Sequence, residues 1–477
     1  MHRKWWTLLV VCVATFMLLL DITIVNVALP SIEKALHASF QDLQWIVDAY
    51  ALTLAALLLT AGSLADLLGR KRVFITGIAI FTLASLMCGL AGTPLVLNVA
   101  RGLQGIGGAI MFACSLALLA QEFHGRERGT AYGAWGAAIA GAAAVGPLVG
   151  GGLTEGLGWE YIFFLNLPIG VLAIVLAVLR LGESRDDEAT HVDWAGLVTF
   201  SASLFLLVLA LIRGNDDGWG SPQILAELAA AGALLIAFLV VEVRQARPMF
   251  DLTLFRKPTF AGASLVAFSV SASIFAMFLY ITLYLQNVLG LSPLQTGLRF
   301  LPITALGFLI APVAGRLSAQ MPPRWFLGGG VGLVALGLWL MHGLSATSSW
   351  TTLLPGFIAA GIGLGVVNPT LAQVAIGVVA PARSGMASGI NNTCRQVGIA
   401  TGIAGLGALF QHAVKTKAVQ LHSHSPLAAK QAFASGLNEI LLVAALVAAV
   451  GAILGLLLVR RRDMAAGTAH AEMAGVA

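Results

Sequence analysis

About fourteen apolar runs, most of them long enough to cross a bilayer, follow one another along the 477 residues. A helix of about 20 residues spans about 30 Å of hydrocarbon. Charged residues make up only 10% of the chain, against about 25% in soluble domains. The strict alternation of apolar and polar residues that is typical of a membrane β-barrel is absent from the sequence. The sequence therefore predicts an all-α polytopic membrane protein. The runs cover residues 5–29, 43–67, 73–92, 95–120, 130–153, 160–181, 194–213, 222–243, 259–286, 294–318, 325–344, 352–378, 384–412 and 435–460.

Basic residues indicate how the spans are oriented. If the N-terminus is cytoplasmic, most of the 27 Lys and Arg residues fall in cytoplasmic loops, span ends and tails. This bias predicts a multi-pass protein of the cell (inner) membrane with both termini cytoplasmic. The outer loops then hold only Lys34, Arg213, Lys415, Lys417 and Lys430.

A weak internal repeat divides the spans into two halves. Residues 61–64 resemble 314–317, and residues 128–133 resemble 384–389. Parallel repeats of this kind are typical of transporters that bind their substrate at the repeat interface. We predict an N-terminal six-helix bundle, a two-helix insert, and a C-terminal six-helix bundle with a cytoplasmic tail. Their boundaries are 1–185, 186–250 and 251–477.

An acidic residue, Asp21, lies inside the first apolar run. An ionised carboxylate near the middle of a span costs about 2.5–3.5 kcal/mol on insertion scales. Its helical face also carries Ala14, Met17, Ile24 and Ala28, small and apolar residues that favour close helix packing. We therefore expect the carboxylate to face the protein interior. It is interpreted as a proton-binding group, with a structural hydrogen-bonding role as the alternative.

A tight glycine-rich turn, residues 62–72, joins the second and third spans. Gly62 would let a neighbouring helix approach closely. Asp66 can pair with a base such as Arg126 or Arg128, or with a helix N-terminus. The spacing favours a conformational latch over an incidental loop. The predicted latch consists of Gly62, Asp66, Gly69 and Arg70.

This turn resembles the cytoplasmic loop signature of the major facilitator superfamily, and other segments agree. Residues 101–109 resemble that family's fourth-helix motif, and residues 141–151 resemble its fifth-helix antiporter motif. The stretch 20–30 is similar to the first-helix motif of the fourteen-span drug:proton antiporters of the EmrB/QacA type. Segments 159–168 and 383–396 also look like that group. The resemblance covers about residues 5–460, and implies the major facilitator fold with two extra transmembrane helices.

Two departures accompany the resemblance. Glu160 stands where the family usually has a base, and the second copy of the cytoplasmic loop lacks its acid. A latch in the C-terminal half is therefore doubtful.

We predict a proton-coupling set of Asp21, Asp48 and Arg101, in which the resemblance implies the role of Arg101. A buried Arg beside carboxylates favours their charged forms, so its movement would control when they bind protons. For Arg101 the alternative is a packing residue that snorkels outward. Asp48 either couples with Asp21 or is an interfacial carboxylate.

The segment Gly146-Pro147 lies in the fifth span. Pro147 cannot donate a hydrogen bond to Ala143, so the helix should bend there. Gly146 and Gly150, spaced as GxxxG, would let a partner helix seal against it. The resemblance implies that this helix shapes the antiporter's gate and limits leak, with mere packing as the alternative.

The predicted substrate cavity contains aromatic and polar residues. Phe278 and Tyr280 of the ninth span suit a broad hydrophobic cavity, although a lipid-facing or packing stripe is equally consistent. Arg395 lies near mid-membrane, where it either holds the C-terminal half together or meets an anionic substrate group. Asn26 and Asn391 complete the predicted cavity.

No catalytic or metal-binding motif accompanies these features. His412, His422 and His424 flank an outer loop of about twenty residues that we expect to be solvated rather than metal-binding. The four cysteines have no ligand spacing. We predict no enzyme activity, no cofactor and no nucleic-acid partner.

The sequence thus predicts a secondary active transporter that exports lipophilic or cationic drugs and toxic compounds in exchange for protons by alternating access. The alternative is a dedicated exporter of a single metabolite, siderophore or self-made antibiotic; a ligand sensor on a transporter scaffold is disfavoured. Expected partners are hydrophobic small molecules, protons and the bilayer. The sequence leaves open whether a periplasmic adaptor and an outer-membrane channel take part.

Overall fold

The computed structural model describes residues 3–123, 126–185, 193–245, 248, 250–318, 321–379, 384–421, 425–460 and 463. In these residues, fourteen helices are long and apolar enough to cross a membrane. The prediction of an all-α protein with about fourteen spans is confirmed. The helices are α1 (Arg3–Leu36), α2 (Phe40–Leu68), α3 (Arg70–Gly89), α4 (Pro94–Glu122), α5 (Arg126–Gly156), α6 (Tyr161–Phe164), α7 (Asn166–Arg180), α8 (Trp194–Asp217), α9 (Pro222–Arg244), η1 (Leu252–Arg256), α10 (Pro258–Val270), η2 (Ser271–Phe275), α11 (Ala276–Leu283), η3 (Tyr284–Val288), α12 (Pro293–Ser318), α13 (Pro323–Leu340), η4 (Trp350–Leu353), α14 (Leu354–Gly377), α15 (Ser384–Leu421) and α16 (Pro426–Leu458).

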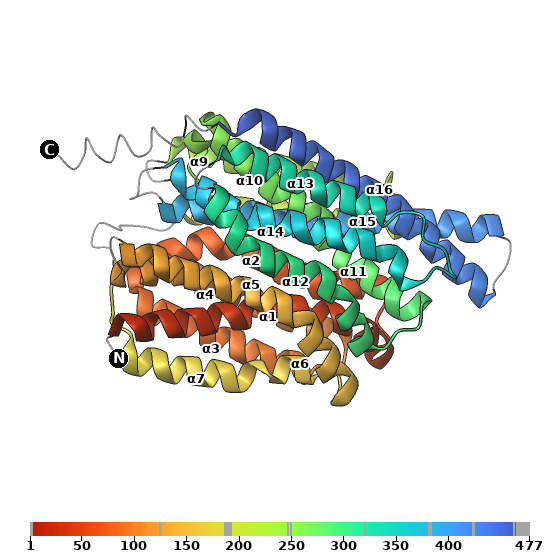
Figure 1. Cartoon of the computed structure of the whole chain (residues 1–477), viewed down its shortest axis with the longest axis horizontal. Coiled ribbons are helices and arrows are strands. Elements are labelled where there is room, and N and C mark those ends of the chain that lie inside the picture. The colour runs from red at the N-terminus through yellow and green to blue at the C-terminus, as the bar shows by residue number, and fades with distance from the viewer. Residues whose placement is uncertain are drawn as a thin grey trace. The chain divides into compact units, whose positions relative to one another are not determined.

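The chain forms two compact units, whose helices are labelled in Figure 1. Unit 1 comprises Met1–Phe205 and Ala231–Phe250, and unit 2 comprises Leu206–Ala230 and Asp251–Ala477. The division falls within α8 and α9, the two helices of the predicted insert. The two ends of this helix pair therefore cluster with different units.

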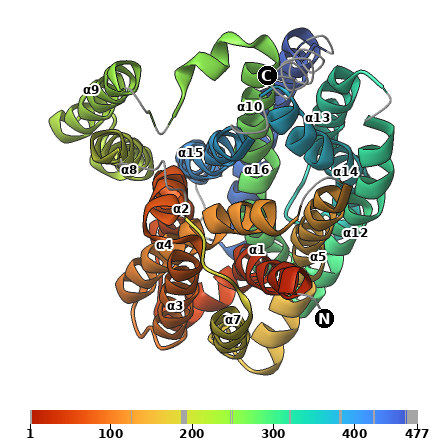
Figure 2. The same cartoon turned by 90° about the vertical axis from the view of Figure 1, so that its left-hand side faces the viewer.

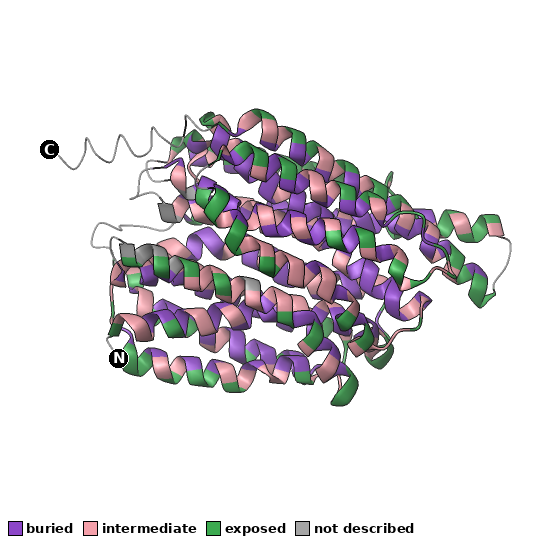
Figure 3. Ribbon diagram, viewed as in Figure 1, coloured by how far each residue is buried: buried purple, intermediate pink, exposed green. Residues whose placement is uncertain are grey.

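In unit 1, α4 packs between α2 and α3, and α1 packs against α5 and α7 (Figure 2). Small residues make these contacts close. A Cβ atom at Gly107 of α4 would lie 2.5 Å from the backbone nitrogen of Phe81 on α3. The helix α7 buries a single stripe of residues, and exposed residues occupy its other faces (Figure 3). Helix α7 thus has one packed face and one apolar, exposed face. This pattern is typical of a helix at the border between protein and lipid.

In unit 2, α14 packs against α12 and α13, and α16 packs against α13, α15 and α10. Glycines again bring backbones together: a Cβ atom at Gly363 of α14 would lie 2.5 Å from the carbonyl oxygen of Gly330 on α13. Such close contacts between small residues are the main way in which helices pack in lipid, because the burial of apolar surface does not drive helices to associate there.

Two helix ends differ from the sequence-based boundaries. The first helix continues through Pro30 to Leu36, so Asp21 lies close to the middle of the helix. Helix α15 continues to Leu421, and α16 begins at Pro426. The predicted loop of about twenty residues is therefore wrong. No Gly or Pro interrupts residues 412–421, so the helix extends, and Ser425 caps the next one. His422 and His424 lie outside the described residues.

Two spans are irregular in ways that the sequence analysis did not anticipate. The ninth span contains two π-helical turns, η2 and η3, on either side of α11. The sixth span is divided at Leu165 into α6 and α7. Pro168 explains this division, because it lacks the N–H that would bond to the carbonyl of Phe164. The interruption places Asn166 at the start of α7.

Candidate functional site

Asp21 is fully buried in unit 1, on the face of α1 that the sequence predicted to be packed. The other residues of that face, Ala14, Met17, Ile24 and Ala28, are also buried. The Asp21 carboxylate points toward α4 and α7, whose polar side chains contact it. A buried carboxylate at mid-helix is thus held inside the protein and not in lipid.

The main partner of Asp21 is Arg101 on α4. The Arg101 Nη1 atom lies 2.5 Å from Asp21 Oδ2, and the Arg101 side chain is 1% exposed. Its Nε donates to the backbone carbonyl of Ile46 on α2 at 3.0 Å. The guanidinium carbon also lies 4.3 Å from the centre of the Tyr50 ring, within the range of a cation–π contact. Arg101 therefore joins three helices of unit 1 and does not snorkel outward.

Three neutral side chains complete the cluster, and the sequence analysis gave none of them a role. Gln104 Nε2 and Asn166 Nδ2 each donate to Asp21 Oδ1 at 2.9 Å. Both amides also donate to Ser85 Oγ, which in turn donates to the carbonyl of Phe163. Gln104 lies within the fourth-helix motif, and Asn166 within the segment 159–168, so the resemblance offered a signal for both.

The hydrogen bonds at Asp21 suit the ionised carboxylate. All its recorded partners are donors: one guanidinium on Oδ2 and two amides on Oδ1. A protonated carboxyl group would need an acceptor for its own O–H, and it would lose the charge that attracts Arg101. The described arrangement is therefore that of a carboxylate that accepts from Arg101, Gln104 and Asn166.

Asp48 on α2 is also fully buried. Within the described residues, neither of its carboxylate oxygens has a hydrogen-bond partner, and no ion pair links it to Arg101. The link to Arg101 is indirect, because Ile46, two residues earlier, accepts the Arg101 Nε bond. The structure thus places Asp48 inside unit 1 but not in the Asp21 cluster.

The glycines of the fifth span pack on α1, beside the Asp21 cluster. A Cβ atom at Gly146 would overlap the Thr23 side chain, and one at Gly150 would lie 2.8 Å from the carbonyl oxygen of Ile24. Pro147 stands between them, inside α5. The helix that seals against this GxxxG segment is therefore α1, at residues two and three positions after Asp21.

Replacement of Gly150 by Leu should destabilise the protein by about 1–3 kcal/mol, because the new side chain meets the backbone of Ile24. The matched control is Gly152→Leu on the same helix, where no atom lies within 4 Å of a Cβ position. The measurement is the thermal unfolding midpoint in detergent. Equal midpoints for the two variants would contradict the tight contact between α1 and α5.

The predicted latch contains an ion pair between the end of α2 and the start of α3. Asp66 pairs with Arg70 one helical turn later, at 2.9 Å, whereas the side chains of Arg126 and Arg128 lie outside the described residues. In unit 1, nothing lies within 4 Å of a Cβ position at Gly62, so the predicted close approach is not made there. The turn itself needs Gly69, whose φ of 106° favours glycine.

Glu183, which follows α7 in the chain, holds this turn. Its Oε1 accepts from the backbone N–H of Lys71 at 3.1 Å, and its Oε2 lies 3.6 Å from Arg72 Nε. The backbone N–H of Arg70 donates to the carbonyl of Ser184. The segment after α7 therefore caps the start of α3, whose N-terminus favours a negative charge.

The residues of the predicted substrate cavity are divided between the two units. In unit 1, Asn26 donates to the carbonyl of Ile22 on its own helix. In unit 2, Tyr280 is fully buried and donates to the carbonyl of Ile403, and Asn391 is buried against the carbonyl of Ala263. Phe278 and Arg395 are partly exposed, and both lie beside Phe275.

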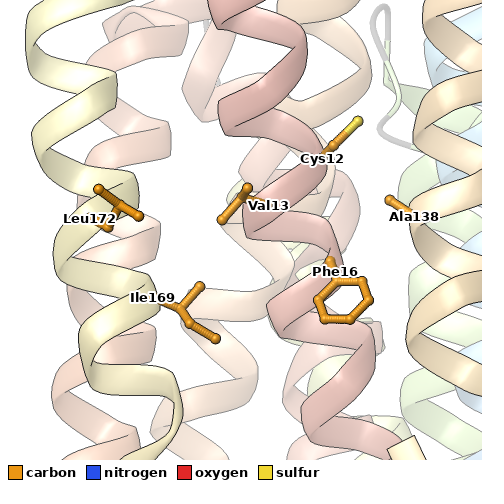
Figure 4. A pocket seen from close by; sticks show the side chains of 6 residues that line it. All are labelled: Cys12, Val13, Phe16, Ala138, Ile169 and Leu172. Carbon is orange, nitrogen blue, oxygen red and sulfur yellow. The ribbon is translucent and has the colours of Figure 1, made fainter. Parts of the chain in front are cut away.

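A pocket of about 400 Å³ opens on unit 1, between α1, α5 and α7 (Figure 4). Its lining offers no hydrogen-bonding side chain apart from one thiol, so it cannot orient a polar ligand. It lies on a different face of α1 from Asp21. The lining residues are Cys12, Val13, Phe16, Ala138, Ile169 and Leu172.

Comparisons with known proteins agree with this architecture. The tetracenomycin C resistance and export protein of Streptomyces glaucescens is 37% identical over 409 residues, which cover 85% of this chain and 76% of that protein. The multidrug resistance protein Stp of Mycobacterium tuberculosis is 37% identical over 404 residues, covering 84% and 75%.

A solved structure has the same fold. It is a bacterial homologue of the human lysosomal transporter Spinster in an inward-facing, unoccupied conformation, with a TM-score of 0.68 and coverage of 98% of both chains. At 17% identity this likeness concerns the fold alone. The sequence profile of the Major Facilitator Superfamily matches residues 11–403, more than half of the chain. The protein therefore belongs to the Major Facilitator Superfamily.

Proposed function

We propose that the protein exports lipophilic small molecules, including cationic drugs, in exchange for protons by alternating access. The observation that carries this proposal is the buried ion pair between Asp21 and Arg101 at the middle of a membrane-spanning helix. A charged pair in that position is expensive to bury, and such groups in membrane proteins mark ion and proton pathways.

In the proposed cycle, Asp21 alternates between a carboxylate and a protonated state. The described arrangement corresponds to the carboxylate, with donors from Arg101, Gln104 and Asn166. Protonation would remove the charge that holds the Arg101 guanidinium, and so would loosen α1 from α4. Because Gly146 and Gly150 pack directly on α1, this loosening would also reach α5. One proton entering the cell gains about 2.3 kcal/mol per 100 mV of membrane potential.

We place both termini in the cytoplasm and the protein in the cell (inner) membrane, on the bias of the Lys and Arg residues. The turn held by the Asp66–Arg70 pair and by Glu183 would then lie on the cytoplasmic side. There it would act as a latch that is released when the bundles 1–185 and 251–477 change orientation. Asp48 would be a second proton site, supported by its burial without a partner among the described residues.

The cargo is proposed from the relatives. One is named for multidrug resistance, which supports a broad range of lipophilic compounds. Another is named for resistance to and export of a single compound, which supports the second candidate, a dedicated exporter of one metabolite or antibiotic. A periplasmic adaptor and an outer-membrane channel are optional partners of either candidate.

Everted membrane vesicles test the proposal. With an acidic vesicle interior, vesicles containing the protein should take up ethidium, and a protonophore should stop the uptake. Vesicles from the same host without the protein give the background. Uptake that persists after the pH gradient and the membrane potential have been removed would contradict proton-driven export.

A further inference from the structure

Unit 2 contains a basic residue deep within a span and almost no acid to balance it. The sequence has no Asp or Glu between Asp251 and Glu439. Arg395 lies in this stretch, on α15, about eleven residues or roughly 17 Å from the first residue of that helix. A guanidinium at such a depth, without an acidic partner among the described residues of unit 2, is costly and therefore points to a function.

Among the described residues of unit 2, no acid contacts Arg395. Its nearest recorded partner is an aromatic ring: the guanidinium carbon lies 5.9 Å from the centre of Phe275. Glu439 is exposed on α16. The remaining acids have other partners: Asp216 with Lys415, Asp217 and Glu227 with Arg213, Asp251 with Thr253, and Asp463 with Thr259. Arg395 therefore does not hold unit 2 together through an ion pair.

A row of aromatic rings extends from Arg395 into the core of unit 2. Phe275 and Phe278 have ring centres 6.1 Å apart, Phe278 and Phe300 are 5.2 Å apart, and Phe300 and Phe357 are 5.5 Å apart. The last two rings are buried, whereas Phe275 and Phe278 are partly exposed beside the partly exposed Arg395. The guanidinium of Arg395 therefore lies beside two partly exposed rings, and the two buried rings pack behind them.

The backbone around these rings is irregular. Phe275 is the last residue of the π-helical turn η2, a feature that is frequent at functional sites. Ser271, at the start of this turn, is 1% exposed, and within the described residues its hydroxyl has no hydrogen-bond partner. The turn packs on α15 next to Arg395: a Cβ atom at Gly398 would lie 3.0 Å from the Cβ of Ser271. Among the described residues, a hydroxyl without a hydrogen-bond partner and a guanidinium without an acidic partner therefore lie on two elements that pack together, η2 and α15.

We propose that Arg395, Phe275 and Phe278 form a subsite in unit 2 for an anionic group carried on an aromatic ring, so that aromatic acids belong to the cargo. The guanidinium would bind a carboxylate through two parallel N–H donors, and the rings would stack on the aromatic part of the cargo. This inference rests on the proposed export function and adds a class of substrate to it.

Binding of two matched probes to the purified, full-length protein in detergent tests this subsite. The probes are 2-naphthoate and its neutral isostere 2-naphthamide, measured by equilibrium dialysis. The wild type should bind 2-naphthoate about tenfold or more tightly than 2-naphthamide. Arg395→Gln should remove this preference, because it lowers the affinity for 2-naphthoate and leaves the affinity for 2-naphthamide unchanged. Arg395→Lys should retain part of the preference. The control, Arg299→Gln, removes another span arginine that stacks on a ring, Trp350 at 5.2 Å, and should keep the full preference.

Equal affinity of the wild type for both probes would overturn the subsite, and so would a preference that survives in Arg395→Gln. If Arg395→Gln does not elute as a single species, the wild-type comparison and Arg395→Lys decide the question. The same preparations, reconstituted, are tested for proton-driven ethidium uptake. If proton-driven ethidium uptake is intact but the protein does not prefer 2-naphthoate to 2-naphthamide, the subsite is overturned and the proposed function is not. Absence of proton-driven uptake overturns the proposed function, whatever the probes show.

Discussion

Replacing Asp21 with Asn is expected to reduce proton-driven uptake of ethidium into everted vesicles to the background of vesicles without the protein. An amide cannot bind and release a proton in the working pH range, so exchange of protons for cargo should stop. Asn can still accept hydrogen bonds through its oxygen, and it has almost the same size as Asp. The variant should therefore insert into the membrane and bind cargo, although Arg101 loses its counter-ion.

The matched control for this prediction is Glu439→Gln. Glu439 is also an acid within a spanning helix, but it is exposed on α16, so its loss should leave uptake unchanged. Membrane content of each variant is measured by immunoblot, and each rate is divided by that content. Full uptake by Asp21→Asn at wild-type content would exclude this residue as the proton carrier.

Replacing Arg101 with Gln is expected to destabilise the protein by about 3–5 kcal/mol, the cost of leaving one member of a buried ion pair alone. The Asp21 carboxylate would keep two amide donors but no positive charge. The carbonyl of Ile46 would lose its donor, and the ring of Tyr50 would lose its cation. The measurement is the thermal unfolding midpoint of the purified variant in one detergent and at one protein concentration.

A double-mutant cycle separates the ion pair from general disruption. The variant that combines Asp21→Asn with Arg101→Gln leaves neither charge of the pair buried alone, so it should be more stable than the sum of the single effects predicts. Arg299→Gln serves as the control, because Arg299 stacks on Trp350 and has no recorded ion pair. Single effects that add within about 0.5 kcal/mol would show that Asp21 and Arg101 are not coupled.

The sequence was a good guide to charged residues in the spans. Burying a charge in lipid is so unfavourable that its position alone indicates a role, and helical periodicity gives the face on which it lies. Asp21 and the buried face around it were predicted in this way. The neutral members of the cluster, Ser85, Gln104 and Asn166, were not, because an amide or hydroxyl in a span carries no comparable penalty. Their convergence on Asp21 depends on how α3, α4 and α7 pack.

Connections between spans were predicted less well, because hydropathy marks only the apolar part of a helix. Helix α15 continues through polar residues to Leu421, whereas the hydropathy of the sequence predicted a loop in this segment. The pairing of Asp66 with Arg126 or Arg128 stays a prediction, whereas Arg70, four residues later, makes an ion pair with Asp66 at little entropic cost. Glu183 follows α7, more than a hundred residues after the turn that it caps. Only tertiary structure joins the two.

The most direct test of the account is whether cargo binding releases a proton from Asp21. Purified protein in weakly buffered detergent solution, with a pH-indicating dye, is mixed with saturating ethidium at a series of starting pH values. The wild type should release protons on binding, whereas Asp21→Asn should bind ethidium and release fewer or none. Binding to the wild type without proton release, or the same release from Asp21→Asn, would contradict the proposal that this buried carboxylate exchanges its proton for cargo.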